Sequence, residues 1–256
     1  MILRSKRLEP YVEKIVWQGD GSAQPFTVYP DIYHVMGIQN RGKITLVSGE
    51  QIQPLQSAGL TGIHQTPKVF QTTASYSSVL IYFRPEALYK WQLCSPRELT
   101  DASIALTDLG IQASGWNRLL DSQASLNPWE LLSLTEEMIW DSFKDNEPDR
   151  WANWAVSRIS SSKGSIRVGQ LAEESTLSRR QFERRFVERI GVSPKSLAQI
   201  VKFQHVLQSM KNVERLTHLA YDAEYYDQSH FIKDFRKRSG ATPKQIQASE
   251  MLWLPE

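Results

Sequence analysis

The C-terminal part of the chain contains an internal duplication, and this repeat constrains the fold more than any other feature of the sequence. The alanine recurs after 48 residues, whereas the other four positions recur after 49. The first copy consists of Ala172, Phe182, Phe186, Gly191 and Pro194, and the second consists of Ala220, Phe231, Phe235, Gly240 and Pro243. One extra residue in the turn of the second copy accounts for the difference. The shared spacing predicts two copies of one helical unit.

The first copy has the local signals of two short helices joined by a turn. Ser165 is expected to cap the first helix, which carries Leu171 and the small Ala172 inward so that the next helix can cross closely. Ser178 is expected to start the second helix, with Gln181 three residues later completing a capping box. These signals predict a helix-turn-helix unit.

The second helix of each copy carries two phenylalanines four residues apart, which therefore share one face. Gly191 and Gly240 suit the left-handed residue that ends a helix. In the second copy Asp227 or Tyr226 is expected to begin this helix. The helix before it is expected to pack through Leu216, Leu219 and Ala220.

A longer helix is expected between the two copies. Ser193 is a good N-cap and Pro194 suits the first turn, so the helix should begin there and run to about Met210. Its apolar stripe consists of Ile200, Phe203, Val206, Leu207 and Met210. Thr242-Pro243 predicts a last short helix that covers the second unit. The connecting helix would hold the two units rigidly, about one turn of duplex apart.

Charge divides the chain in the same place. From Arg150 onward there are 18 Lys and Arg against 11 Asp and Glu, hence +7, whereas residues 1–149 hold 12 against 17, hence −5. A basic half beside an acidic half indicates that one half meets polyanions. The alternative is a plain helical bundle whose basic residues are solvated, but the duplicated spacing is hard to obtain by accident.

The first half of the chain is predicted to be rich in strands. Short β-branched and aromatic runs separated by turn residues are expected to form an antiparallel sandwich or barrel: Phe26–Tyr29, Tyr33–Ile38, Lys43–Val47, Lys68–Thr72 and Ser78–Phe83. Helices are expected over Pro85–Leu93, Ala113–Asp121 and from Asn127-Pro128 to about Phe143. The polar run 144–150 is predicted to be the interdomain linker.

The expected fold class is therefore α+β. A β-rich sensor domain (1–112) is followed by a helical dimerisation and connector region with its linker (113–149). An all-α double helix-turn-helix domain (150–256) completes the chain.

Composition excludes several classes of protein. Cys94 is the only cysteine, so there is no disulfide framework and no cysteine-cluster zinc site. The five histidines lack metal-ligand spacing, and we expect neither metal nor cofactor. No apolar run is long enough to span a bilayer and the N-terminus does not resemble a secretory signal, so a cytoplasmic location is expected. Nucleophile-elbow, P-loop and dinucleotide motifs are absent, so we expect no enzymatic activity.

The repeat resembles the AraC/XylS family of bacterial transcription regulators over about Trp151 to Gln247. The matching stretches are Leu171-Ala172, Ser178-x-x-x-Phe182-x-x-x-Phe186 and Gly191-Val192-Ser193-Pro194, then Leu219-Ala220 and Tyr225-x-x-Gln228-Ser229-His230-Phe231-x-x-x-Phe235, ending in Gly240-x-Thr242-Pro243. Two turn positions depart from the family pattern. Thr176 replaces the turn glycine of the first unit, and Glu224-Tyr225 replaces the usual Gly-Phe of the second. A non-glycine residue in a left-handed turn costs roughly 1 kcal/mol.

The resemblance implies which side chains read DNA. Base-reading positions are Arg180, Glu183, Arg184, Gln228, Ser229, Ile232 and Lys233. Side chains expected to touch phosphate are Arg179, Arg185, Lys195, Arg236, Lys237 and Lys244, each of which is about as readily explained as a solvated residue.

The first half also resembles the N-terminal domain of some members of this family, through Leu80-Ile81-Tyr82-Phe83-Arg84-Pro85 and Glu98-Leu99-Thr100-Asp101. The expected partners are double-stranded DNA, a small-molecule effector, RNA polymerase and a second copy of the chain, but no membrane. Association would use the helices between Ala113 and Phe143. Effector candidates on the concave strand face are Tyr29, Tyr33, His34, Tyr76 and Tyr82, for each of which an ordinary core position is the plain alternative.

Two other functions compete with a sensing regulator. An alkyl-transfer DNA repair enzyme can share this DNA-binding module, but it needs a reactive cysteine and a cysteine-rich zinc site that one cysteine does not supply. An architectural DNA-binding protein needs no effector pocket at all.

Overall fold

The structure is a computed structural model of the whole chain, and it describes residues 1–21, 23, 25–92, 94–109, 114–210 and 227–248. Several expectations lie outside the described residues. These are the first helix of the second unit with Leu216, Leu219 and Ala220, and the turn residues Glu224, Tyr225 and Tyr226.

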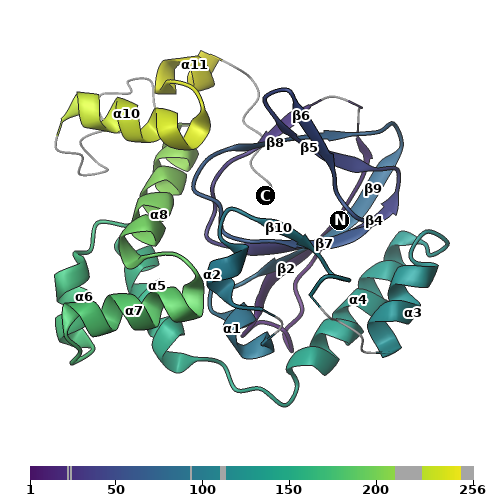
Figure 1. Cartoon of the computed structure of the whole chain (residues 1–256), viewed down its shortest axis with the longest axis horizontal. Coiled ribbons are helices and arrows are strands. Elements are labelled where there is room, and N and C mark those ends of the chain that lie inside the picture. Colours follow the sequence, from purple (N-terminus) through teal and green to yellow (C-terminus); the bar gives the residue numbers. More distant parts are fainter. Residues whose placement is uncertain (22, 24, 93, 110–113, 211–226, 249–256) are drawn as a thin grey trace.

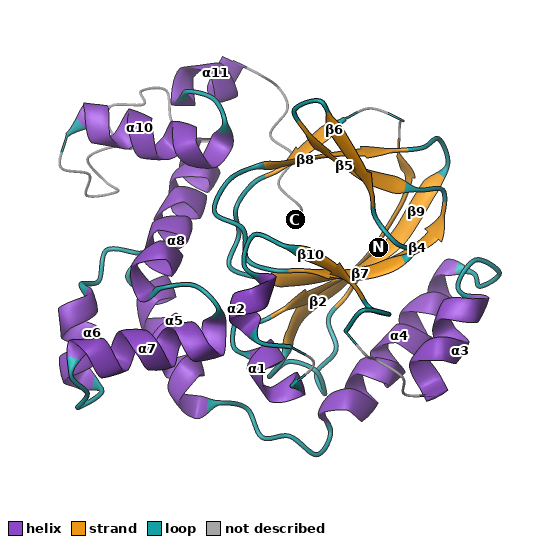
Figure 2. Cartoon of the chain, viewed as in Figure 1, coloured by secondary structure: helices purple, strands orange, loops and turns teal. Residues whose placement is uncertain are grey.

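Two antiparallel sheets form the first half of the chain (Figures 1 and 2). The six-stranded sheet has the order β1-β2-β9-β4-β7-β10, with bounds Ile2–Leu3, Val12–Gly21, Tyr76–Phe83, His34–Arg41, Ala58–Thr61 and Ser103–Ala105. The four-stranded sheet has the order β3-β8-β5-β6, with bounds Phe26–Val28, Lys68–Thr72, Ile44–Ser48 and Gln51–Pro54. The expected antiparallel sandwich-like or barrel-like half is confirmed. Strands β1, β2, β6, β7 and β10 had not been predicted.

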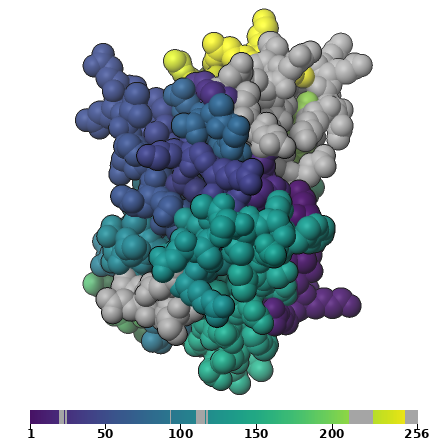
Figure 3. Space-filling model, turned by 90° about the vertical axis from the view of Figure 1, so that its right-hand side faces the viewer, coloured from purple at the N-terminus to yellow at the C-terminus, as the bar shows by residue number. Residues whose placement is uncertain are grey.

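One face of the six-stranded sheet is packed under helices. Met36 and Ile38 of β4 and Ile81 and Phe83 of β9 have no exposed surface. Alternate residues of a strand point to the same side, so these four side chains share one face of the sheet. They pack with three helices: α1 (Ala87–Trp91), α3 (Ser114–Ser122) and α4 (Pro128–Phe143). Helix α2 (Pro96–Leu99) follows α1. Figure 3 shows α3 and α4, in teal, forming the lower part of the face seen there, with the strands above them.

Helix α4 begins where the sequence indicates. The Asn127 side chain accepts hydrogen bonds from the backbone amides of Trp129 and Glu130, and the Glu130 carboxylate accepts one from the Asn127 backbone amide. This capping box satisfies amides that a helix start leaves unpaired. The shorter helix expected over Pro85–Leu93 spans only Ala87–Trp91.

The rest of the described chain is helical. Its helices are α5 (Arg150–Ser161), α6 (Val168–Glu174), α7 (Arg179–Ile190), α8 (Pro194–Ser209), α10 (Gln228–Ser239) and α11 (Pro243–Ala248). Helix α8 joins two groups of helices: α5, α6 and α7 pack at one end, and α10 and α11 at the other (Figure 1). Its predicted stripe of Ile200, Phe203, Val206, Leu207 and Met210 is buried, which confirms its role as the shared core element.

The expected cap at Ser165 is wrong. Helix α6 begins at Val168 with Arg167 as its N-cap, and no side chain caps it. Ser165 lies in the turn after Gly164, and its hydroxyl donates to the Ser162 carbonyl at 2.8 Å. Two residues therefore separate Ser165 from the helix that it was expected to cap.

None of the described helices combines the length and the apolar character that crossing a bilayer requires.

Candidate nucleic-acid interface and ligand cavity

Helix α7 is held by signals at both ends. The Ser178 hydroxyl accepts from the Gln181 amide at 3.4 Å, and the Gln181 side chain accepts from the Ser178 amide at 3.0 Å, which confirms the predicted capping box. Gly191 ends the helix with a φ of 93°. A Cβ on Gly191 would also lie 2.4 Å from the Pro96 carbonyl oxygen, so glycine permits the first half of the chain to approach here.

The two phenylalanines of α7 decide which face is free. Phe182 and Phe186 have no exposed surface and stack with ring centroids 6.0 Å apart. The opposite face is turned to solvent, and Arg179, Arg180 and Arg184 are exposed on it. The structure thus presents the basic face that the sequence indicates.

Glu183 and Arg179 form an ion pair within this face, with Nε and Oε1 2.9 Å apart. The two residues lie four apart on the helix, and the side chain of Arg179 is 71% exposed and that of Glu183 43% exposed. Exposed pairs of this kind contribute only about 0.2–1 kcal/mol, so DNA can separate them at small cost.

Arg185, which is predicted to contact phosphate, packs against the Trp151 ring. Its guanidinium carbon lies 4.4 Å from the centroid of the Trp151 ring, and the side chain is half-buried. Trp151 belongs to α5 and also contacts Phe182, with ring centroids 5.3 Å apart. Arg185 therefore holds α7 against α5, and we no longer expect it to contact phosphate.

Replacing Arg185 by alanine tests this reassignment. We expect Arg185→Ala to lower the free energy of unfolding by about 0.5–2 kcal/mol, because the cation–π contact is lost. The DNA affinity of the folded fraction should change by no more than about 0.5 kcal/mol, as for a surface substitution away from the interface. Urea unfolding and a gel-shift titration measure the two quantities. A loss of affinity with unchanged stability would restore the phosphate role.

Helix α10 repeats the construction of α7. The Asp227 side chain accepts from the His230 amide at 2.7 Å, and Gly240 ends the helix with a φ of 79°. Phe231 and Phe235 are buried. The outer face exposes Gln228, Ser229, Ile232, Lys233, Arg236 and Lys237. Ser229, Ile232, Lys233, Arg236 and Lys237 together line a shallow concavity.

One basic residue of α10 serves the fold and was missed at the sequence level. Arg238 is 1% exposed, and its guanidinium donates to the Gln199 side chain of α8 at 3.0 Å. Asp234, one turn earlier, lies 3.4 Å from Arg238 Nε. Phe235 also contacts Phe203 of α8, with ring centroids 5.3 Å apart. These contacts fix α10 on the same helix that carries α7.

The turn between α6 and α7 contains a non-glycine residue in the left-handed region. Thr176 has a φ of 56°, at the position where the sequence resemblance expects glycine. The backbone of the turn is therefore kept, and the threonine bears the roughly 1 kcal/mol cost.

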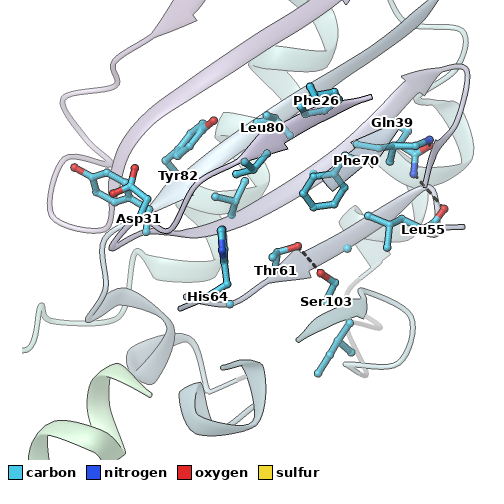
Figure 4. Close-up of a pocket in the computed structure, with 18 of the residues that line it drawn as sticks. Phe26, Asp31, Gln39, Leu55, Thr61, His64, Phe70, Leu80, Tyr82 and Ser103 are labelled. Carbon is cyan, nitrogen blue, oxygen red and sulfur yellow. Dashed lines mark hydrogen bonds between the residues drawn. The ribbon is translucent and has the colours of Figure 1, made fainter. Parts of the chain in front are cut away.

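A cavity of about 500 Å³ lies in the first half of the chain, on the face of the six-stranded sheet away from α3 and α4. The four predicted tyrosines, Tyr29, Tyr33, Tyr76 and Tyr82, all line it. Figure 4 shows Asp31 and Tyr82 at one end, Gln39 and Leu55 at the other, and Phe70 and Leu80 between them.

His34 does not line this cavity, and its assignment as an effector residue is corrected. It is fully buried, and burial lowers its pKa to about 4. Its neighbour Val35 does line the cavity, because successive residues of β4 point to opposite faces. His34 therefore faces away from the space that Tyr33 and Tyr82 enclose.

Burial changes the acid–base properties of the cavity wall. It raises the pKa of Asp31 to about 6, despite the backbone amide of Ile32 donating to Asp31 at 2.7 Å. Burial, followed by the nearby Asp31 carboxylate, raises the pKa of Tyr82 to about 12, and the same two causes raise the pKa of Tyr33. The tyrosines therefore stay neutral at physiological pH, whereas Asp31 titrates close to it.

The cavity reaches the connecting helix of the other half. Gln204 and Gln208 of α8 are among its lining residues, and the Gln204 amide donates to the carbonyl of Pro30. Tyr29 meets Phe203 of α8 edge-on, with ring centroids 6.2 Å apart. The sequence contained one signal for the contact between the cavity and α8, since Gln204 and Gln208 lie four residues apart on the less apolar side of this helix.

A second contact joins the halves at the end of α7. The Thr100 hydroxyl donates to the Gly191 carbonyl at 3.0 Å, and the Asn153 side chain of α5 donates to Glu86 at 3.0 Å. The first half is thus bonded both to α8 and to the end of α7. Within the described residues, no cluster of three or more His, Cys, Asp or Glu side chains could hold a metal.

Comparison with known proteins assigns part of the chain. Residues 171–249 match the model of a family described as a helix-turn-helix domain. No curated protein matches the sequence.

Three solved structures illustrate what the chain is similar to, two of them over most of its length and one over less than half. ToxT from Vibrio cholerae is 11% identical, with 91% of this chain and 97% of ToxT covered at a TM-score of 0.48. A structure of ToxT bound to an unsaturated fatty acid is 12% identical, with 91% and 94% covered at a TM-score of 0.42. The C-terminal domain of AraT, a response regulator from Geobacillus stearothermophilus, is 18% identical, with 42% and 93% covered at a TM-score of 0.38.

Proposed function

We infer from the AraC-type helix-turn-helix domain at residues 171–249 that this chain is a DNA-binding transcription regulator, with α7 and α10 entering successive major grooves of one duplex. The observation that carries the proposal is the placement of two exposed basic helices on one buried helix, α8. Phenylalanine pairs hold each inner face in the core, so each basic outer face stays exposed to solvent.

The exposed side chains have chemistry suited to reading bases. Arg180 and Arg184 of α7 can each grip guanine with two hydrogen bonds, and Glu183 can accept from cytosine. On α10, Gln228 can pair with adenine and Ile232, which is 38% exposed, can meet a thymine methyl. Ser229 and Lys233 complete the proposed reading set, and Arg179, Lys195, Arg236 and Lys237 are proposed to contact phosphate.

We further propose that the cavity holds a small-molecule effector. A ligand there would touch Gln204 and Gln208 of α8, the helix that positions both α7 and α10. Its binding can therefore change the affinity for DNA. An architectural DNA-binding protein would have no use for this connection. The cavity therefore favours the sensing regulator over that alternative.

Selection of bound sequences from a random pool of duplexes tests the DNA-binding proposal. We expect an enriched site with two parts whose centres lie about one helical turn apart. Sequence-independent retention of DNA, or a single short element, would contradict the use of both helices.

Arg184→Ala is expected to weaken binding to the selected site by about 1–3 kcal/mol, because one bidentate base contact is lost. The discrimination between specific and random DNA should fall by the same factor. Arg41→Ala is the matched control, since Arg41 is exposed at the far end of β4. Gel-shift titrations at fixed salt measure both variants. Equal affinities for Arg184→Ala and Arg41→Ala would remove Arg184 from the reading set.

A further inference from the structure

The cavity has a polar end built from one carboxylate and two aromatic rings. Asp31 lies just before β4, Tyr33 two residues later, and Tyr82 on the neighbouring strand β9. The rings of Tyr33 and Tyr82 meet edge-on, with centroids 6.2 Å apart at an angle of 87°. Figure 4 shows the Asp31 carboxylate at this end of the cavity, beside Tyr82.

The described residues that line the cavity include negatively charged side chains and none with a positive charge. Asp31 and Asp108 are the charged residues among the described side chains that line the cavity, and lysine and arginine are absent from that set. Phe26, Phe70 and Leu80 make the middle of the cavity apolar. An anionic ligand would have to bring a second negative charge into a partly buried site beside Asp31, which is costly.

His64 adds an acceptor to the same wall. Its Nδ1 lies 2.7 Å from the Thr66 carbonyl oxygen, which can only accept, so Nδ1 carries the proton. Burial, the first cause, and Lys68 lower the pKa of His64, so the ring is neutral. Its Nε2 is then an acceptor, suited to a ligand that donates hydrogen bonds.

Lys14 is a cation close to this end, on the same face of the sheet as Tyr82. It lies on β2 opposite Tyr82, with Nζ 5.0 Å from the Tyr82 ring centroid, and it is not among the lining residues. Its attraction lowers the pKa of Asp31, yet burial still holds that pKa at about 6. Lys14 therefore compensates the Asp31 charge only in part.

We propose that the cavity binds an apolar molecule bearing a cationic amine, whose ammonium lies between the Asp31 carboxylate and the ring of Tyr33. The tail of the ligand lies along Phe26, Phe70 and Leu80 towards Gln39. The ammonium is recognised by a charge-assisted hydrogen bond and by cation–π attraction. The inference rests on the proposed effector site and names its ligand class.

A matched set of octyl probes tests the charge preference on the full-length protein. Isothermal titration at pH 7.5 compares octylamine, octanol and octanoate, which share a tail and differ in the charge of the head. We expect octylamine to bind about tenfold more tightly than octanol, and octanoate to bind more weakly than either. Octanoate binding as tightly as octylamine would overturn the proposal.

Substitution of Asp31 locates the preference. Asp31→Asn keeps the size of the side chain and removes the charge, so it should abolish the advantage of octylamine and leave octanol unchanged. Asp121→Asn is the matched control, because Asp121 is exposed on α3 outside the cavity. An octylamine affinity that is equal in wild type and Asp31→Asn would contradict the assignment.

Lys14→Met distinguishes a cation site from an anion site. If the ammonium of the ligand sits beside Asp31, removal of the competing Lys14 charge should strengthen octylamine binding several-fold. If Lys14 instead anchors an anion, the same variant should weaken octanoate and leave octylamine no tighter. The second pattern would overturn the proposal even if the cavity binds ligands.

The pH dependence follows from the same geometry. The charged and titratable groups around Asp31 are Lys14, Glu13, Tyr33, Tyr82 and Arg84, and Glu13 is paired with Arg84 at 3.1 Å. Octylamine stays protonated below pH 9, whereas free Asp31 becomes neutral below its pKa of about 6. Octylamine affinity should therefore be full above pH 7 and fall by about tenfold in total as Asp31 becomes protonated below pH 6, a dependence that Asp31→Asn should lack.

Failure of this inference and failure of the proposed function give different results. A preference for octanol or octanoate contradicts the cationic ligand but still supports an effector cavity. Absence of binding by all three probes overturns both the cationic ligand and the effector role. Gel-shift assays on the same preparations report the DNA-binding function independently of either outcome.

Discussion

The double variant Arg184→Ala/Lys233→Ala is expected to bind the selected DNA site about 2–6 kcal/mol more weakly than the unchanged protein. Each single change should cost about 1–3 kcal/mol, because each removes one proposed base contact. The two residues lie on α7 and α10, at opposite ends of α8, so they share no partner (Figure 1). Costs at separated sites add, and the loss should range from roughly thirtyfold to beyond ten-thousandfold.

Gel-shift titrations of the two single variants and the double variant at one salt concentration measure this additivity. Arg41→Ala/Lys43→Ala removes the same number of charges from an exposed turn between β4 and β5 and should leave affinity almost unchanged. If the double variant bound the selected site as tightly as the weaker-binding of the two single variants, only one of the helices would engage DNA at a time.

The second large effect is expected in the core beneath α7. Phe182→Ala should lower the free energy of unfolding by about 3–5 kcal/mol, the range for a buried phenylalanine. Phe182 has no exposed surface and packs against Phe186 and Trp151, with ring centroids 6.0 and 5.3 Å away. Its removal leaves a cavity where α5 and α7 meet, which is the support of the first reading helix.

Urea unfolding followed by circular dichroism measures this loss, and Ile52→Ala is the control. Ile52 is 64% exposed, so its truncation should cost no more than about 0.5 kcal/mol. For a chain of this size the melting temperature of Phe182→Ala should fall by about 2–4 °C for each kcal/mol. A stability equal to that of Ile52→Ala would show that the Phe182 ring is not part of a cooperative core.

Local signals in the sequence were enough to predict the reading helices. Ser178 with Gln181 marked the start of α7, Gly191 marked its end, and the spacing of Phe182 and Phe186 identified its inner face. Each of these signals acts over one or two turns of a single helix, so it depends little on residues far away in the sequence. Asn127-Pro128 predicted the start of α4 for the same reason.

The same kind of signal failed at one helix start, and local patterns missed half of the strands. Ser165 resembles an N-cap, but the turn at Gly164 delays the helix to Val168. Five strands of the sheets were not predicted, among them β7, whose residues become a strand only by pairing with β4 and β10. Strand pairing joins residues far apart in the sequence, and no local pattern contains it.

The repeated residues by themselves determined that this chain has two helices, α7 and α10, with buried phenylalanine pairs and basic outer faces. Only the tertiary structure decided which basic residues are exposed. Across helix interfaces, Arg185 packs on the Trp151 ring and Arg238 donates a hydrogen bond to Gln199. The tertiary structure also decided that Tyr33 enters the cavity while His34 turns away, since the pairing of β4 sets which face each residue takes. A helical face is fixed by spacing along one segment, whereas a cavity and its charge depend on segments that meet only when the chain is folded.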